Sequence, residues 1–190
     1  MRSAALANRP LAGREPGDRH VSVIQGEFQV TDDPAVVLTT LLGSCVAACI
    51  HDPVARVGGL NHFLLPSGEG RPGADHLRYG VHSMELLVNG LLKLGGRRDR
   101  LQVWLFGGAR ITRQLADIGA SNAAFAEDFV RREEFTYKGG SLRGDTARRI
   151  QFWPASGRVR QLALPNTPVE VLPVAPPRAP APATDDPEFF

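Results

Sequence analysis

The sequence is poor in cysteine and has no long apolar run. Only 2 of its 190 residues are cysteine, and no stretch approaches the roughly 20 apolar residues that a membrane-spanning helix needs. The first residues also lack the apolar core of a signal peptide, because Asn, Pro, Gly and Arg interrupt their short Ala/Leu runs. We therefore expect a cytoplasmic protein without membrane insertion, in which Cys45 and Cys49 stay reduced.

An excess of charge of one sign is also missing. The chain has 22 Lys and Arg against 20 Asp and Glu, a formal net charge of +2. This is too small to favour nucleic acid or an anionic membrane surface as a partner. A hydrophobic content of 43% with 22% charged residues is ordinary for a globular protein. The length suits one domain with a substantial core.

The two ends of the chain differ in composition from its middle. Residues 1–19 are rich in Arg, Gly and Pro without periodicity, and residues 165–190 are rich in Pro and Ala. Repeated prolines remove backbone donors and prevent regular pairing. We predict disordered tails on either side of a single folded domain over residues 20–164.

Strand patterns come first within this domain. They cover residues 21–30, 36–40, 44–52 and 57–66. The last two segments are separated by Asp52-Pro53-Val54-Ala55-Arg56, a composition typical of a hairpin connection. The pattern therefore predicts that these two strands are neighbours in one sheet.

Helical patterns follow in the middle of the chain. Residues 82–94 carry apolar side chains at spacings of three and four and stop at Gly95-Gly96. A shorter helix is predicted over about 111–117, ending near Gly119. A third would begin with Asn122 as its cap and run through Arg132.

Further strands close the domain. One lies between the helices, and the others follow them; the segments are 101–106, 134–138, 148–153 and 158–164. The last two flank a turn, Pro154-Ala155-Ser156-Gly157. Strands at both ends with helices between them predict an α+β fold rather than an alternating parallel sheet.

A polar interruption stands at the head of an apolar strand. In TTLLGSCVAACI the pair Gly43-Ser44 precedes Cys45, and a tight turn there would lift the sulfur clear of the strand. Nucleophilic catalysis by cysteine needs a base and a group that orients the base. His62 lies in the strand predicted to pair with that of Cys45, and Thr39 lies on the preceding strand. The alternative is that both cysteines fill a core, and this interpretation is favoured for Cys49.

Other candidate sites are weaker. His51, His76 and His82 have no zinc-site spacing to each other or to the cysteines, so no metal is expected. Gly107-Gly108 lacks the lysine and the spacing of a phosphate loop, and it is better explained by close backbone approach beside the site. Two arginine pairs are interpreted as solvent-facing, namely Arg131-Arg132 and Arg148-Arg149.

A longer segment resembles a known family. The segment TTLLGSCVAACIHDPVARVGGLNHFLLP, with GEFQVTDDP before it and RYG, a Met-containing helix and FGGA after it, is similar to the chemoreceptor glutamine deamidases, the CheD family. The likeness covers about residues 22–164. It implies Cys45 as nucleophile, His62 as base and acid, and Thr39 as the residue that orients His62. It also implies a layered β-sandwich core flanked by helices, similar to cysteine-dependent deamidating toxins, and no cofactor.

The resemblance implies an activity and partners. The expected reaction converts glutamines of methyl-accepting chemotaxis receptors to glutamate through a cysteine thioester, and hydrolysis of glutamyl methyl esters is open as a second reaction. The alternative is a non-catalytic adaptor that binds receptors or a CheC-type chemotaxis phosphatase; a general cysteine peptidase is a weaker third. Further oxyanion or substrate candidates are Ser44, Asn61, Gly107 and Gly108.

Two positions depart from the family pattern. The family carries Arg in a segment IG-x-R-N, where this chain has Ile118-Gly119-Ala120-Ser121-Asn122. It also has an acidic residue shortly before a later Gly-Gly, where this chain has Tyr137-Lys138-Gly139-Gly140. Both lie outside the proposed catalytic residues, so they bear on docking more than on the reaction.

Overall fold

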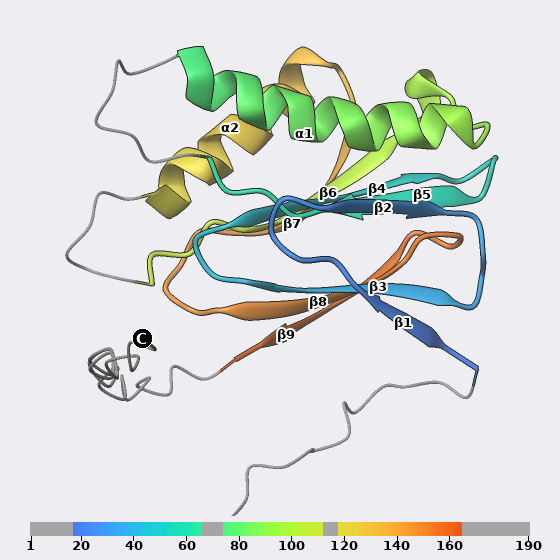
Figure 1. Ribbon diagram of the computed structural model, residues 1–190, viewed down its shortest axis with the longest axis horizontal. Helices are drawn as coiled ribbons and strands as arrows, with labels where there is room; N and C mark the ends of the chain where they lie inside the picture. The colour runs from blue at the N-terminus through green and yellow to red at the C-terminus, as the bar shows by residue number, and fades with distance from the viewer. Residues whose placement is uncertain (1–16, 66–73, 112–117, 165–190) are drawn as a thin grey trace, which may run out of the picture.

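The computed structural model describes residues 17–65, 74–111 and 118–164. It has three layers: two helices, a five-stranded sheet beneath them, and a four-stranded sheet beneath that (Figure 1). The predicted α+β fold with a β-sandwich core and flanking helices is therefore confirmed. The predicted tail at 165–190, residues 1–16 of the tail predicted at 1–19, and most of the predicted helix at 111–117 lie outside the described residues, while Arg19 already belongs to the first strand.

The predicted strands are found, but some of their ends are shifted: the strand predicted at 57–66 ends at Asn61, and the one predicted at 134–138 covers Thr136–Leu142. In chain order the elements are β1 (Arg19–Ser22), β2 (Phe28–Thr31), β3 (Val36–Leu42), β4 (Val46–Asp52), β5 (Val57–Asn61), α1 (Ala74–Lys93), η1 (Arg98–Arg100), β6 (Gln102–Gly107), α2 (Ile118–Arg132), β7 (Thr136–Leu142), β8 (Arg148–Trp153) and β9 (Arg158–Ala163). The strand-like segment 21–30 is divided into β1 and β2, which belong to different sheets.

The strand order makes each sheet a mixed one. The five-stranded sheet has the order β2-β5-β4-β6-β7 and the four-stranded sheet the order β1-β3-β8-β9. The pairs β1/β3 and β6/β7 are parallel and the other pairs are antiparallel. The two predicted hairpins, β4–β5 and β8–β9, are confirmed.

Strand β4 lies between two cores, which explains why it does not alternate. Val46, Ala48 and Ile50 belong to the core under the helices. Ala47 and Cys49 belong to the core between the sheets. A strand buried on both faces is expected to be a nearly continuous apolar run. The interpretation of Cys49 as a small buried hydrophobe is confirmed, because its exposed fraction is 0%.

The helices depart from their predicted bounds at their starts. Helix α1 begins at Ala74 rather than at residue 82. Its predicted glycine end is confirmed, because Gly95 has φ +90° and the amides of Gly95 and Gly96 donate to the carbonyls of Leu92 and Leu91. Neither of the two described α-helices combines the length and the apolar character that crossing a membrane requires.

Two predictions about α2 were wrong. The helix begins at Ile118, so Gly119 does not end a helix and Asn122 does not cap one. A Cβ atom at Gly119 would collide with the carbonyl oxygens of Gly108 and Ala109, so close backbone packing explains this glycine. Asn122 is fully buried, and its side chain binds other segments.

The β4–β5 connection is held by a buried carboxylate. Asp52 accepts hydrogen bonds of 2.8 to 3.0 Å from the amides of Val54, Ala55 and Arg97 and from the guanidinium of Arg100. Burial alone would raise the pKa of Asp52, but these donors together lower it to about 2. The Asp-Pro connection is therefore a structural feature that fixes the register of β4 and β5.

Candidate active site

Cys45 stands at the end of the β3–β4 turn with its sulfur partly open to solvent. Its accessibility is intermediate, whereas Cys49 is buried. The Cys45 thiol donates a hydrogen bond of 3.3 Å to Oε1 of Gln25, in the loop between β1 and β2. The predicted turn therefore does separate the first cysteine from the core that holds the second.

The turn is braced by the segment that follows β6. The amide of Gly108 donates to the carbonyl of Cys45 at 2.7 Å, and the amide of Ala109 donates to that of Gly43 at 2.8 Å. Gly107 has φ +109°, and a Cβ atom there would collide with the Cys45 carbonyl oxygen. The interpretation of Gly107-Gly108 as a site of close backbone approach is confirmed. The amide of Gly108 is already engaged by Cys45, so it is not available as an oxyanion donor.

His62 follows β5 and is fixed by its own backbone. Its amide donates to the carbonyl of Glu27 at 3.0 Å, and its carbonyl accepts from the amide of Gly26 at 2.7 Å. The next residue, Phe63, pairs with Val46 through two hydrogen bonds of 2.9 Å. This register makes Cys45 and His62 diagonal neighbours on the sheet face that is turned toward the second sheet.

The hydrogen bonds of the His62 ring define its tautomer. Nδ1 lies 2.9 Å from Oγ1 of Thr40 and 3.3 Å from the carbonyl oxygen of Val23. The Thr40 hydroxyl donates its proton to the Val23 carbonyl at 2.8 Å, so its oxygen accepts from Nδ1–H. Both neighbours of Nδ1 are then acceptors, which assigns the proton to Nδ1 and a lone pair to Nε2.

The other ring nitrogen is a buried acceptor without a donor. Nε2 of His62 is inaccessible to solvent and has no hydrogen-bond partner among the described residues. Buried polar atoms in native proteins are nearly always paired. The described residues have three other unpaired atoms, both ring nitrogens of His20 and Nε2 of Gln151, and that of His62 differs in lying on the sheet face next to Cys45. A free lone pair on the sheet face that also carries Cys45 is suited to accept the thiol proton.

The threonine that contacts His62 is Thr40 and not the predicted Thr39. The hydroxyl of Thr39 donates to the carbonyl of Val21 on the neighbouring strand β1, at 3.4 Å. Successive side chains of a strand project to opposite faces. Leu38 and Leu42 project into the core between the sheets, and Thr40 is in phase with them. The inward phase of β3, which the structure supplies, is therefore what selects Thr40 over Thr39.

Burial keeps both reacting groups neutral in the resting site. It raises the pKa of the Cys45 thiol, although the residue's own backbone N–H lowers it in part. Burial lowers the pKa of His62, and the hydrogen bond to the Val23 carbonyl opposes this. The resting pair is therefore a thiol and a neutral imidazole rather than a thiolate and an imidazolium.

Asn61 projects to the opposite side of the sheet from His62. Its Oδ1 accepts from the amide of Ala48 at 2.9 Å, and its Nδ2 donates to the carbonyl and the hydroxyl of Ser83 at 3.3 Å. Its exposed fraction is 0%. The prediction of a substrate contact for Asn61 is wrong, because the side chain is used to join β4, β5 and α1.

The sequence interpretation missed a second asparagine that supports the site. Oδ1 of Asn122 accepts from the amide of Leu65 at 2.7 Å, and its Nδ2 donates to the carbonyls of Ser44 and Ile118 at 3.1 and 2.8 Å. Helix α2 is thereby linked both to the residue before Cys45 and to the segment after His62. The oxyanion or substrate role of Ser44 stays a prediction.

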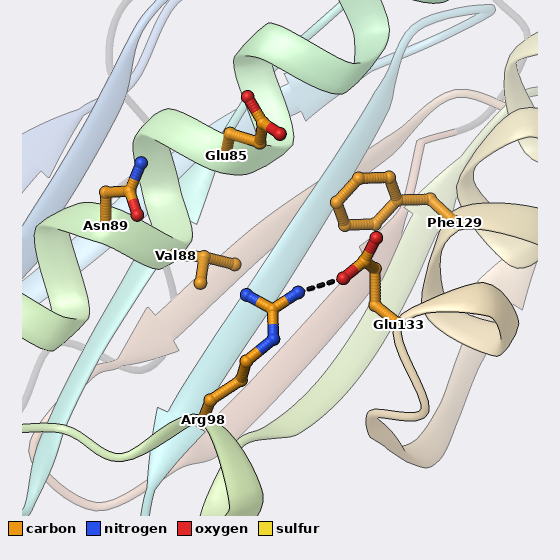
Figure 2. A pocket seen from close by; sticks show the side chains of 6 residues that line it. All are labelled: Glu85, Val88, Asn89, Arg98, Phe129 and Glu133. Carbon is orange, nitrogen blue, oxygen red and sulfur yellow. Dashed lines mark hydrogen bonds and ion pairs between the residues drawn. The ribbon is translucent and has the colours of Figure 1, made fainter.

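A hollow in the helix layer is separate from these residues. It has a volume of about 180 Å³ and lies between α1, η1 and α2 (Figure 2). Arg98 points into it and forms an ion pair with Glu133, so its charge is already neutralised. The helices cover the face of the five-stranded sheet opposite to Cys45 and His62 (Figure 1).

The other charged and metal-ligating residues have structural explanations. Arg131 and Arg132 are exposed and pair with Asp128, as the solvent-facing interpretation predicts. Arg148 contradicts it: the side chain is buried and donates to the carbonyl and hydroxyl of Ser141 and to nearby carbonyls. Within residues 17–65, 74–111 and 118–164, no three His, Cys, Asp or Glu side chains gather as a metal site.

Comparisons with known proteins show the family of the chain. The family described as CheD chemotactic sensory transduction matches residues 64–162. A Caulobacter vibrioides protein named "Probable chemoreceptor glutamine deamidase CheD" is 56% identical over 173 residues, which are 90% of this chain and 92% of that relative. The chain belongs to the CheD family.

Further CheD relatives cover the chain to a similar extent. A Rhizobium meliloti protein with the same name is 53% identical over 93% of this chain and 98% of its own length. One from Agrobacterium fabrum is 49% identical over 93% and 99%. Among solved structures, the Neisseria meningitidis protein NMB0706 matches with a TM-score of 0.44 and 11% identity, over 68% of this chain and 65% of that one. The recognition of the CheD family is confirmed.

Proposed function

We propose that the protein is a protein-glutamine deamidase that acts on the cytoplasmic domains of methyl-accepting chemotaxis receptors. Its relatives are named chemoreceptor glutamine deamidases. The observation that carries the proposal for this chain is the unpaired Nε2 of His62, whose Nδ1 is held by Thr40. The ring therefore has the tautomer of a general base, and we propose that it takes the thiol proton once Cys45, which donates to Gln25 in the resting structure, is released. We propose a cytoplasmic location as well, because the proposed substrate is the cytoplasmic domain of a receptor.

Each residue has a role in the proposed reaction. As the substrate carboxamide approaches, the Cys45 thiol transfers its proton to Nε2 of His62, and the sulfur attacks the carbonyl carbon. Thr40 accepts from Nδ1–H throughout and stabilises the imidazolium that forms. This role replaces the one predicted for Thr39. The carbon–nitrogen bond then breaks, and ammonia leaves with the proton from His62.

The second half of the reaction uses the same groups. Water gives a proton to His62 and attacks the thioester, and the Cys45 sulfur leaves and recovers its proton, which yields glutamate. The backbone N–H of Cys45 lowers the pKa of the thiol, and we propose it as a donor to the oxyanion, together with the amide of the preceding Ser44. A methyl ester would pass through the same thioester with methanol as leaving group, so esterase activity belongs to the same proposal.

The competing proposal is a non-catalytic adaptor that binds receptors or a CheC-type phosphatase. An adaptor needs surface complementarity, but it has no use for a buried, unpaired ring nitrogen, which is costly to the folded state. The geometry around His62 therefore favours the enzyme, and a CheC-type phosphatase remains a proposed binding partner of that enzyme.

The experiment mixes the protein with a receptor cytoplasmic fragment and maps the conversion of each glutamine to glutamate by peptide mass spectrometry. Wild type and Cys49→Ala should convert specific glutamines, whereas Cys45→Ala and His62→Ala should not. The two cysteine variants are matched, because they remove the same atom from sites of different accessibility. Binding without conversion by wild type would leave the adaptor in place of the enzyme.

A further inference from the structure

The side chain on the Cys45 sulfur is itself a glutamine. Oε1 of Gln25 accepts the thiol hydrogen bond at 3.3 Å. Gln25 is an exposed residue, so its side chain has water as an alternative partner. In the resting structure the sulfur therefore faces a carboxamide, the chemical group that the proposed reaction consumes.

The loop that carries Gln25 is anchored on both sides. The amide of Gly26, directly after Gln25, donates to the His62 carbonyl, and the Glu27 carbonyl accepts from the His62 amide. On the other side, the carbonyl of Val23 accepts from Thr40. The amide of Glu27 also donates to the carbonyl of Ile24 at 3.1 Å, which closes a turn around Gln25. The backbone that holds the proposed base thus also sets the position of the Gln25 carboxamide.

The hydrogen bond between Cys45 and Gln25 has the geometry of a carboxamide that is bound at the sulfur but has not been attacked by it. In a hydrogen bond the carbonyl oxygen is the atom nearest to the donor, so the Gln25 carbonyl carbon lies farther from the sulfur than Oε1. The thiol also keeps its proton, because burial raises its pKa. A substrate carboxamide must bring its carbon to this sulfur, and it cannot do so while Gln25 remains there.

We propose that Gln25 is an internal pseudosubstrate: its carboxamide fills the subsite on Cys45 that the receptor glutamine takes, and the substrate displaces it. This inference rests on the proposed deamidase function and identifies the subsite for the carboxamide. Only the fraction of molecules with Gln25 swung away is competent to bind, and the apparent affinity for substrate is reduced by that fraction. The residue thereby favours substrates with enough further contacts to displace it.

The test compares Gln25→Ala with Gln29→Ala, a matched change of an exposed glutamine on β2. The first readout is the rate at which iodoacetamide alkylates Cys45, located by peptide mapping. Removing one hydrogen bond to an exposed side chain should accelerate labelling by about two- to tenfold in Gln25→Ala. Gln29→Ala should label at the wild-type rate. Labelling of Gln25→Ala at or below the wild-type rate would overturn the inference.

The second readout is the deamidation of a receptor fragment. Gln25→Ala should lower KM by a similar factor and leave kcat unchanged. A fall in kcat would make Gln25 a participant in catalysis, and Cys45-dependent conversion of Gln25 itself to glutamate would make it a substrate; either result overturns the pseudosubstrate. The alkylation readout needs no receptor. Faster labelling of Gln25→Ala without any deamidation by wild type would therefore refute the proposed function while Gln25 still covers the thiol.

Discussion

The two threonines of β3 differ only in the face of the strand from which their hydroxyls project. Thr40→Val removes the acceptor for Nδ1 of His62, so the ring loses its preferred tautomer and orientation. We expect kcat for receptor glutamine to fall by at least about tenfold, since proton transfer by a positioned base contributes a factor of this order or more. Thr39→Val, which loses only a hydrogen bond of 3.4 Å to Val21, should keep most of the activity.

Rescue separates positioning from folding at this residue. Thr40→Ser keeps the hydroxyl and should restore most of kcat, whereas a role in packing alone would make Val the milder change, because Val keeps the volume of Thr and Ser loses a methyl group. Circular dichroism and the urea midpoint of each variant check that the fold is retained. If Thr39→Val and Thr40→Val lowered kcat equally, the Thr40 hydroxyl would have no special role in orienting the His62 ring.

The protonation state of Cys45 gives a second prediction for a single residue. Its pKa is raised above the ordinary value of 9.0, and that of His62 is lowered below 6.5. Alkylation depends on the thiolate, so the labelling rate should climb steadily from about pH 6 to about pH 9 without a plateau. His62→Ala should give nearly the same profile. A plateau at low pH that disappears in His62→Ala would reveal a resting thiolate–imidazolium pair instead.

The position of a site residue could be predicted where it follows from a local hairpin. It could not be predicted where it depends on which face of a strand is buried. The hairpin between β4 and β5 could be predicted from its Asp-Pro connection, and it brings Cys45 and His62 to the same sheet face. The choice between Thr39 and Thr40 requires the inward face of β3 to be known. Leu38, Leu41 and Leu42 are compatible with either phase, because both faces of the strand then carry an apolar residue.

At the scale of elements, Asp52 fixes the β4–β5 hairpin, and its effect can be measured. Asp52→Asn replaces an acceptor with a donor facing Arg97 and Arg100, so we expect a loss of roughly 3 kcal/mol in the free energy of unfolding. The exposed Asp99, which pairs with Arg97, provides a control, and Asp99→Asn should cost less than about 0.5 kcal/mol. Urea denaturation of the three proteins gives the comparison.

The pH dependence of this loss has a definite sign. The pKa of Asp52 is about 2 in the folded protein against an ordinary 3.8. The depressed value stabilises the folded state above the ordinary pKa, and this contribution of about 2 kcal/mol disappears as the pH falls from about 4 toward 2. The difference in the free energy of unfolding between wild type and Asp52→Asn should therefore become smaller as the pH falls from about 4 toward 2. A gap that stays constant would mean that the carboxylate is not the source of the stability.

For the helices and the β1–β2 connection, the sequence predicts that an element exists more reliably than where it begins and ends. Gly119 and Asn122 resemble a helix end and a cap, but packing against Gly108 and hydrogen bonds to Leu65 and Ser44 place both inside α2. Tertiary contacts here override the intrinsic preferences of Gly and Asn. Likewise, the segment 21–30 has strand propensity throughout, yet its middle forms the loop that holds His62.

At the scale of the molecule, the proposed active site is assembled from both sheets. Thr40 lies in the four-stranded sheet, Cys45 directly precedes β4 and His62 directly follows β5 of the five-stranded sheet, and Gln25 lies in the loop from β1 to β2. A site of this kind exists only while the sheets remain packed, because no one sheet carries all four residues. Its integrity is therefore tied to the core between the sheets, in which Cys49 lies.

Cys49 can report on that packing. It lies in the middle of β4, with the helices over one face of the sheet and the second sheet over the other (Figure 1). In a Cys45→Ala background it is the only thiol, and burial raises its pKa strongly, so it should resist alkylation in the folded state. We expect its labelling rate to rise with urea. The urea dependence of this rate should equal that of the free energy of global unfolding, measured by circular dichroism. Labelling that proceeds in native buffer and responds little to urea would contradict this, because it would mean that the two sheets separate locally without unfolding the domain.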